Sequence, residues 1–493
     1  MNAKKTIIWL LLVCMLTASL SACRKKEASN TTETTTDAPV DKTPVVVEDE
    51  GIDFWIENNA AFEDAIEGSA ADFEFAEIDG SITVLSYKGT IEHLIVPAVI
   101  NGLPVTAIAD GAFATKKEES EDQPESQEDA AEEQEPALTL KTLILPNSIL
   151  SIGTGILAGC NSLHSLATPL MGKTAQDKQY LGYLFGATTH EDNARDIPVS
   201  LKCLRLTGEW SVLPAYSLFD CNDLICLSLP ETVTVIEKFA IYNGASLRQI
   251  DGLDKVTVFG DRSLMDCESL QTVTFGNTLQ SIGFAAFEGC KSLRALTLPF
   301  VGGSRNENTC LGYIFGAAQP DFAQGFYPQR LERITLTNAC TTLGNYAFFE
   351  CESLKEIILP EGLTSIGLRA FYGCESLWSI KLPDTLTTVR ELAFAECDAL
   401  TEIDFGNGLK EIGINAFYNC DSLTEIILPD TLTAIPASCF AGCTALKSIH
   451  MGGVSEVGAQ AFRHCNAVKT VTANNKIDFE KGNDSVKSVL YPK

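Results

Sequence analysis

The stretch Leu354–Ser376, "LKEIILPEGLTSIGLRAFYGCES", returns along the chain with small changes. Its cysteine marks the period, because cysteines recur in this part of the chain at almost constant intervals. They are Cys351, Cys374, Cys397, Cys420, Cys443 and Cys465. A fixed period of about 23 residues is typical of solenoids, in which each repeat forms one coil. The period therefore predicts a solenoid whose coils stack in sequence order.

The apolar pattern within one coil predicts a short strand followed by a turn. Ile357 and Leu359 alternate with Ile358, so a strand here buries the first two side chains and turns Ile358 outward. Pro360 ends the strand, since proline has no N–H to give to a ladder. Ala370 and Phe371 then place a small and a large side chain in the interior. One coil cannot bury this stripe alone, so we expect stacked coils to share one core.

The recurring cysteines could pack in the core, bind a metal or form disulfides. Zinc sites usually use Cys-x-x-Cys pairs that converge on one ion, and the repeats contain no such pair. A buried cysteine instead behaves as a small apolar side chain whose S–H is a weak donor to backbone carbonyls. We interpret the column as core packing, with partial disulfide formation between adjacent coils as the alternative.

Two steps between cysteines are longer than the repeat. The steps from Cys160 to Cys221 and from Cys290 to Cys351 are equal in length, and we interpret each as one coil plus an insert. The inserts, near residues 169–198 and 299–328, are similar in sequence and superimpose after the shift that carries Cys160 onto Cys290. With both inserts set apart, the sequence predicts about 12 coils of roughly 23 residues each.

The start of the chain has the features of a lipoprotein signal peptide over residues 1–22. Basic residues precede an apolar run that is shorter than the about 20 residues of a membrane-spanning helix. Leu20-Ser21-Ala22-Cys23 then resembles the lipobox of bacterial lipoproteins. The resemblance implies that Cys23 becomes the lipidated N-terminus and that lipid attaches the chain to the bacterial membrane. An ordinary secretory signal is the alternative.

Composition divides the rest of the chain. We expect a flexible acidic and Thr-rich tether over 23–50, an entry segment with the first coil over 51–115, a disordered acidic insertion over 116–137, leucine-rich repeats over 138–475 and a C-terminal cap over 476–493. The tether and the insertion have too few apolar residues to form a core, and like charges keep the insertion extended. The insertion could bind a cation or a basic protein, and an inert solvated loop is the alternative.

The unit at Leu354–Leu377, "LxxIxLPxxLxxIGxxAFxxCxSL", resembles the BspA-like leucine-rich repeats of bacterial surface proteins. The similarity extends from about Phe73 to the C-terminus, although early coils depart from it, as at Ile156-Leu157 in place of Ala-Phe. The resemblance implies a leucine-rich-repeat solenoid with a parallel β-sheet on its concave face and short helices, turns and loops on its convex face. It also implies a role at the cell surface in adhesion to host or matrix proteins.

Charge and motifs exclude several classes of function. A net charge of -29 argues against nucleic acid as a partner, because phosphates require a basic surface. The five histidines are scattered, and no nucleophile elbow, phosphate-binding loop or dinucleotide motif occurs. We therefore predict no enzymatic activity, no metal and no cofactor.

Side chains that point outward from the sheet form the candidate binding face, since solenoids commonly bind partners on the concave side. Trp378 would be an exposed aromatic side chain between Ile358 and Lys381, and such residues anchor interfaces. The alternative is that Trp378 only covers the sheet edge. The residues that we assign to this face are Arg333, Lys355, Glu356, Ile358, Trp378 and Lys381.

Cys203 and Cys226 occupy equivalent outward positions in consecutive coils. Neighbouring strands bring such Cα atoms to about 4.8 Å, within the range of a disulfide. In-register neighbours point the same way, however, which can prevent favourable torsions. The sequence thus predicts a possible disulfide, with two free thiols as the alternative.

Together these features predict an extracytoplasmic, lipid-anchored bacterial surface protein whose repeats bind a protein or glycan partner, such as a host or matrix protein. A passive envelope spacer and a solute-binding lipoprotein are the alternatives. The second would need two α/β lobes around a cleft, which the short repeat period contradicts.

Overall fold

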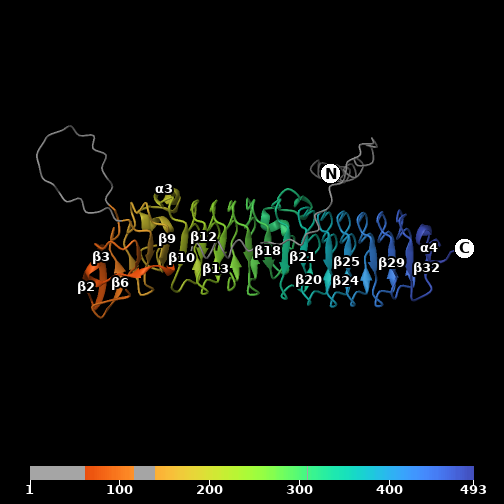
Figure 1. Cartoon of the computed structure of the whole chain (residues 1–493), viewed down its shortest axis with the longest axis horizontal. Helices are drawn as coiled ribbons and strands as arrows, with labels where there is room; N and C mark the ends of the chain where they lie inside the picture. Colours follow the sequence, from red (N-terminus) through yellow and green to blue (C-terminus); the bar gives the residue numbers. More distant parts are fainter. Residues whose placement is uncertain (1–61, 116–138, 308, 493) are drawn as a thin grey trace, which may run out of the picture. The chain divides into compact units, whose positions relative to one another are not determined.

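The computed structural model describes residues 62–115, 139–307 and 309–492 (Figure 1). These residues belong to one unit of the chain, Lys42–Lys493. The predicted signal peptide, Cys23, the tether over 23–50 and the acidic insertion over 116–137 lie outside the described residues.

Each repeat forms one coil with a first strand, a second strand and a turn. In the coil that begins at Leu354, the first strand is β21 (Glu356–Ile358), the second is β22 (Ser365–Ile366), and a turn over residues 368–373 follows. Both strands pair in parallel with the equivalent strands of a neighbouring coil, as in Arg333 with Glu356 and Ser365 with Thr388. Equivalent residues of successive coils therefore lie side by side.

The first strands follow one another in sequence order (Figure 1). They are β1 (Ile66–Glu67), β4 (His93–Ile95), β7 (Thr142–Ile144), β9 (Ser165–Thr168), β10 (Cys203–Leu206), β12 (Cys226–Ser228), β14 (Gln249–Asp251), β16 (Thr272–Thr274), β18 (Ala295–Leu298), β19 (Arg333–Leu336), β21, β23 (Ser379–Lys381), β25 (Glu402–Asp404), β27 (Glu425–Ile427), β29 (Ser448–His450) and β31 (Thr470–Thr472). Hydrogen bonds join them in four runs, β1 to β14, β16 to β21, β23 to β25 and β27 to β31.

The second strands form a matching series on the other side of the coils. They are β8 (Ser151–Ile152), β11 (Val212–Leu213), β13 (Val235–Ile236), β15 (Val258–Phe259), β17 (Ser281–Ile282), β20 (Thr342–Leu343), β22, β24 (Thr388–Val389), β26 (Glu411–Ile412), β28 (Ala434–Ile435), β30 (Glu456–Val457) and β32 (Asp478–Phe479). The leucine-rich-repeat solenoid that the sequence predicts is confirmed.

The expected number of coils was too low, because the described residues form about 16 turns rather than about 12. The two inserts explain about half of the difference, and the strands β1 and β31 at the two ends of the array explain the rest. The stretch between Cys160 and β10 contains a first strand of its own, β9, which pairs with both β7 and β10. It also contains a turn, the 3-10 helix η2 (Leu181–Phe185). Each insert thus belongs to a complete coil that is longer than the repeat.

The surplus residues of these long coils fold outside the sheets. In the first they form η3 (His190–Asp192) and the short helix α3 (Asn193–Asp196). In the second, η4 (Leu311–Phe315) is the turn, and the surplus includes η5 (Pro320–Phe322).

The two ends of the array differ from the repeat. At the N-terminal end, η1 (Ala70–Asp72) leads into the antiparallel pair β2 (Phe73–Ile78) and β3 (Ser81–Tyr87), and β5 (Val99–Ile100) pairs with β6 (Leu103–Ile108). Each pair is joined by a two-residue turn, Asp79-Gly80 or Asn101-Gly102, in which both residues have positive φ. Aspartate or asparagine before glycine favours this turn. At the C-terminal end, α4 (Asp484–Leu490) buries Val486 completely.

Stacked phenylalanines fill the core of the C-terminal coils. Neighbouring rings lie 4.9 to 5.5 Å apart between centroids and are within 18° of parallel. The rings belong to Phe348, Phe371, Phe394, Phe417, Phe440 and Phe462, all fully buried. This spacing matches the distance between neighbouring strands, about 4.8 Å, so strand pairing and ring stacking satisfy each other.

The recurring cysteines pack beside these rings as free thiols. The Cys397 S–H donates to the carbonyl of Phe371 in the preceding coil, with sulfur and oxygen 3.2 Å apart. The same bond is made by Cys160, Cys267, Cys290, Cys374, Cys420, Cys443 and Cys465. Burial raises the pKa of the Cys374 thiol well above its ordinary value, so this thiol stays protonated. The interpretation of the column as core packing is confirmed.

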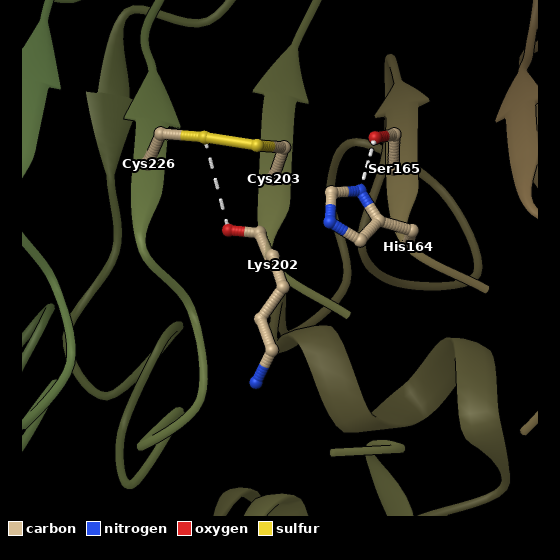
Figure 2. Close-up of a disulfide and its surroundings, with 5 residues drawn as sticks. All are labelled: His164, Ser165, Lys202, Cys203 and Cys226. Atoms are coloured by element: carbon tan, nitrogen blue, oxygen red, sulfur yellow. Dashed lines mark hydrogen bonds between the residues drawn. A yellow bond between two sulfur atoms is a disulfide. The ribbon is translucent and has the colours of Figure 1, made fainter. Parts of the chain in front are cut away.

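A disulfide joins Cys203 of β10 to Cys226 of β12 on the outward side of the first strands (Figure 2). The two residues are register partners, and their Cα atoms lie 4.9 Å apart. Sγ of Cys226 also lies 3.8 Å from the Lys202 carbonyl oxygen, which is a contact only, because a disulfide sulfur carries no proton.

The outward face around this disulfide is covered. Phe62 is only 6% exposed and packs against Ala167, Cys203 and Cys226. The Arg205 guanidinium carbon lies 4.2 Å from the centroid of the Phe62 ring, in a cation–π contact. Phe62, which precedes β1, therefore covers part of the sheet at β9, β10 and β12.

The stacked rings lead to a prediction about stability. We expect Phe394→Ala to lower the free energy of unfolding by about 3 to 5 kcal/mol, because it leaves a cavity between two rings. Phe394→Leu should cost less, since Leu157, Leu218 and Leu264 occupy the same position in other coils. Urea unfolding of the two variants beside the wild type measures this, and equal losses would contradict the cavity explanation, because leucine fills most of the space that alanine leaves empty.

The disulfide leads to a second prediction. Peptide mapping without reduction should show the peptides that contain Cys203 and Cys226 linked, while the column cysteines react with an alkylating agent only after unfolding. Replacing both linked cysteines by alanine should cost about 2 to 4 kcal/mol of stability, as expected for closing a loop of this size. Alkylation of both residues in unfolded, unreduced protein would show that no bond forms.

Candidate functional site

The six residues assigned to the binding face lie on three neighbouring coils. Arg333 is on β19, Glu356 and Ile358 are on β21, and Lys381 is on β23. Lys355 and Trp378 directly precede β21 and β23, which contact each other. The register of the repeat thus brings the predicted residues together, because equivalent positions of successive coils are neighbours.

Several charges of this face are paired across the coils. Lys355 Nζ lies 3.0 Å from Glu332 Oε1, and Arg333 Nε lies 3.7 Å from Glu356 Oε2. Arg294 Nη2 approaches the other oxygen of Glu332 at 4.0 Å. The sequence assignment did not foresee these pairs, although opposite charges one repeat apart are a readable signal. Each partly exposed pair contributes little stability, so the main effect is that the opposite charges largely offset one another.

Trp378 is less exposed than we expected. Its side chain is partly buried, and its indole Nε1 is buried without a hydrogen-bond partner in the described part of the chain. Lys355 and Thr401 hold the same position in the coils on either side, and the Thr401 hydroxyl donates to the Trp378 carbonyl at 3.1 Å. The expectation of an exposed aromatic side chain was wrong, since the Trp378 side chain is only partly exposed and its Nε1 is buried.

Exposed apolar side chains on this face come from isoleucine. Ile358 on β21 is 38% exposed, and Ile427 at the equivalent position on β27 is 59% exposed. Lys381 and Asp404 lie at the same position on the intervening strands and are exposed. In the open part of the sheet, this column therefore has two charged side chains between two apolar ones.

The N-terminal part of the same face is not open in this way. Phe62 covers Ala167, Cys203 and Cys226, and burial raises the pKa of Asp251 on β14 above its ordinary value. By contrast, Thr272 and Thr274 on β16 are exposed. The six predicted residues all belong to coils beyond the covered part.

The described residues form neither a metal site nor a membrane-spanning helix. Within residues 62–115, 139–307 and 309–492, no group of three or more His, Cys, Asp or Glu side chains is placed to hold a metal ion. In the same ranges, no helix has both the length and the apolar character needed to cross a membrane.

Several solved structures are similar to this chain. A leucine-rich repeat protein from Bacteroides ovatus is 20% identical, with 83% of this chain and 97% of that chain covered and a TM-score of 0.31. A leucine rich cell surface protein from Faecalibacterium prausnitzii is 18% identical, with coverages of 85% and 97% and a TM-score of 0.22. The pneumococcal vaccine antigen PcpA is 16% identical, with coverages of 84% and 98% and a TM-score of 0.28.

None of the curated proteins compared with the chain matches it. The model of the BspA type leucine rich repeat region does match, in six copies, over residues 199–306, 323–447 and 364–481. These ranges together include more than half of the chain. The match includes the coils from β19 to β29 that carry the candidate face. The chain therefore belongs to the family of proteins built from the BspA type leucine rich repeat.

Proposed function

We propose that this chain is a non-catalytic surface protein that binds a partner protein through the outward face of β19 to β29. The observation that carries the proposal is the exposure of Ile358 and Ile427 beside ion pairs that are already satisfied within the face. A repeat family with a surface-protein background supports the same interpretation.

The physical argument rests on what a partner would gain. Because Arg333 pairs with Glu356 and Lys355 pairs with Glu332, long-range attraction to these charges is weak. Complete burial of a fully exposed isoleucine gains about 1.5 to 3 kcal/mol. Ile358 and Ile427, which are 38% and 59% exposed, would each gain only the corresponding part of this free energy. Apolar contacts at the centre with ion pairs around them are the usual composition of a protein interface.

A glycan is the alternative partner. Glycans usually stack on the open face of an aromatic ring, and Trp378 is the aromatic residue that we assigned to this face. Its partial burial therefore favours a protein over a glycan.

A second proposal concerns where the protein is located. We infer that Cys23 is lipidated and holds the repeats outside the cytoplasm, with residues 23–50 as a tether. The support is the Leu20-Ser21-Ala22-Cys23 sequence, which lies outside the described residues.

The binding proposal is tested with Ile358→Asp/Ile427→Asp in the chain that begins at residue 24. Two buried charges would replace apolar contacts, so we expect at least a tenfold loss of affinity for a protein captured from host extracellular matrix. Ile78→Asp is the matched control, because Ile78 on β2 is 53% exposed and lies outside this face. Affinity is measured by titration of the captured protein.

Two results would contradict the proposal. If the double variant binds as tightly as the control, the partner uses another surface. If the wild-type chain captures only glycans, and enzymatic removal of the glycans abolishes capture, then the alternative partner class is correct.

The anchoring proposal has a separate test. We expect Cys23→Ser to move the protein from the membrane fraction to the soluble fraction, since lipid could no longer be attached. Mass spectrometry of the wild-type N-terminal peptide should show a diacylglyceryl mass on Cys23. An unmodified cysteine in membrane-bound protein would rule out the lipid anchor.

A further inference from the structure

Two aromatic side chains are exposed on the second long coil, outside the sheet face discussed above. Phe322 is 72% exposed and Phe326 is 43% exposed, both in or just after η5. Exposing an apolar ring to water is unfavourable in free energy. Two exposed phenylalanines only four residues apart therefore need an explanation.

The segment that carries Phe322 and Phe326 is anchored by two neighbouring residues, Ala323 and Tyr327. Ala323 is fully buried, and the Phe326 N–H donates to its carbonyl at 3.1 Å. Tyr327 packs its ring 6.0 Å from that of Phe315, and its hydroxyl donates to the Phe349 carbonyl at 3.1 Å. The exposure thus comes from an anchored segment.

The first long coil shows that the fold does not require aromatic residues here. When Cys160 is aligned with Cys290, the equivalent positions of the first long coil are Asp192 and Asp196. Their carboxylates lie 2.9 and 2.7 Å from the Arg195 guanidinium nitrogens. Two coils of the same length therefore carry an ion-paired surface in one case and an apolar surface in the other.

Several carboxylates lie near one another beside the segment that carries the two phenylalanines. Burial raises the pKa of Glu350, and the negative charges of Glu352, Asp321 and Glu375 raise it further. The Gln324 side-chain amide donates to the Glu352 carboxylate. Asp321 directly precedes Phe322, so the acids and the rings form one surface, which we call the Phe322 surface.

We propose that the Phe322 surface binds a basic segment of a partner protein. Charge complementarity decides the occupant: a lysine or arginine head group can reach the carboxylates while its alkyl stem covers an aromatic ring. A cation above the face of Phe322 or Phe326 adds a cation–π contact. This surface is distinct from the face of β19 to β29, so the inference goes beyond the proposed function.

The test uses the full chain and a fluorescent peptide of twelve residues that contains four lysines and four leucines. A second peptide has glutamate in place of lysine. Phe322→Ser/Phe326→Ser should weaken binding of the lysine peptide at least tenfold. Val199→Ser is the matched control, because Val199 on the first long coil is also 72% exposed, and it should change affinity less than twofold.

Charge is tested with Asp321→Asn/Glu352→Gln, which should weaken binding at low salt and reduce its dependence on salt concentration. Thermal unfolding confirms that each variant is folded. The proposal is overturned if the lysine peptide does not bind, if the glutamate peptide binds equally well, or if the phenylalanine variant binds like the wild type. An unchanged salt dependence in the charge variant would remove the basic partner from the proposal.

Discussion

The stacking of one coil on the next is the contact on which the rest of this structure depends. Strand pairing sets a spacing of about 4.8 Å, and the rings of Phe371 and Phe394 lie 4.9 Å apart, so backbone and core use the same distance. The Cys397 thiol adds a bond from its coil to the one before it. A coil has no core of its own, and its stability therefore belongs to its interfaces with two neighbours.

This constraint separates the inside of a coil from its outside. Interior positions accept only side chains that fit the repeat spacing, which is why the column cysteines are protonated packing residues rather than reactive thiols. Outward positions are free to differ, and there Ile358 is followed by Lys381 and Asp404. Differences in side-chain chemistry between coils therefore indicate function only at the outward positions.

The sequence was sufficient to predict what depends on the period. It predicted the burial of Ile357, the outward direction of Ile358 and the packing of the cysteines. It undercounted the coils in part because the step from Cys160 to Cys221 was interpreted as one coil plus an insert, although Leu163 and Leu166 carry the spacing of a further first strand. It could not predict that Phe62 covers β10 and β12, since that contact joins residues with no periodic relation. The partial burial of Trp378 likewise depends on neighbouring coils.

The two long coils have the same backbone arrangement but present two different surfaces. Both place a first strand, a 3-10 turn and surplus residues in the same order, and Gly186 and Gly316 end the two turns with nearly equal φ of 99° and 100°. Their surplus residues differ in chemistry, with Asp192 and Asp196 paired to Arg195 in one coil and exposed phenylalanines in the other. Because stacking does not involve these positions, stability alone cannot explain the exchange of ion pairs for exposed aromatic rings. Selection for contact with a partner is the explanation that the physical chemistry of the second coil favours.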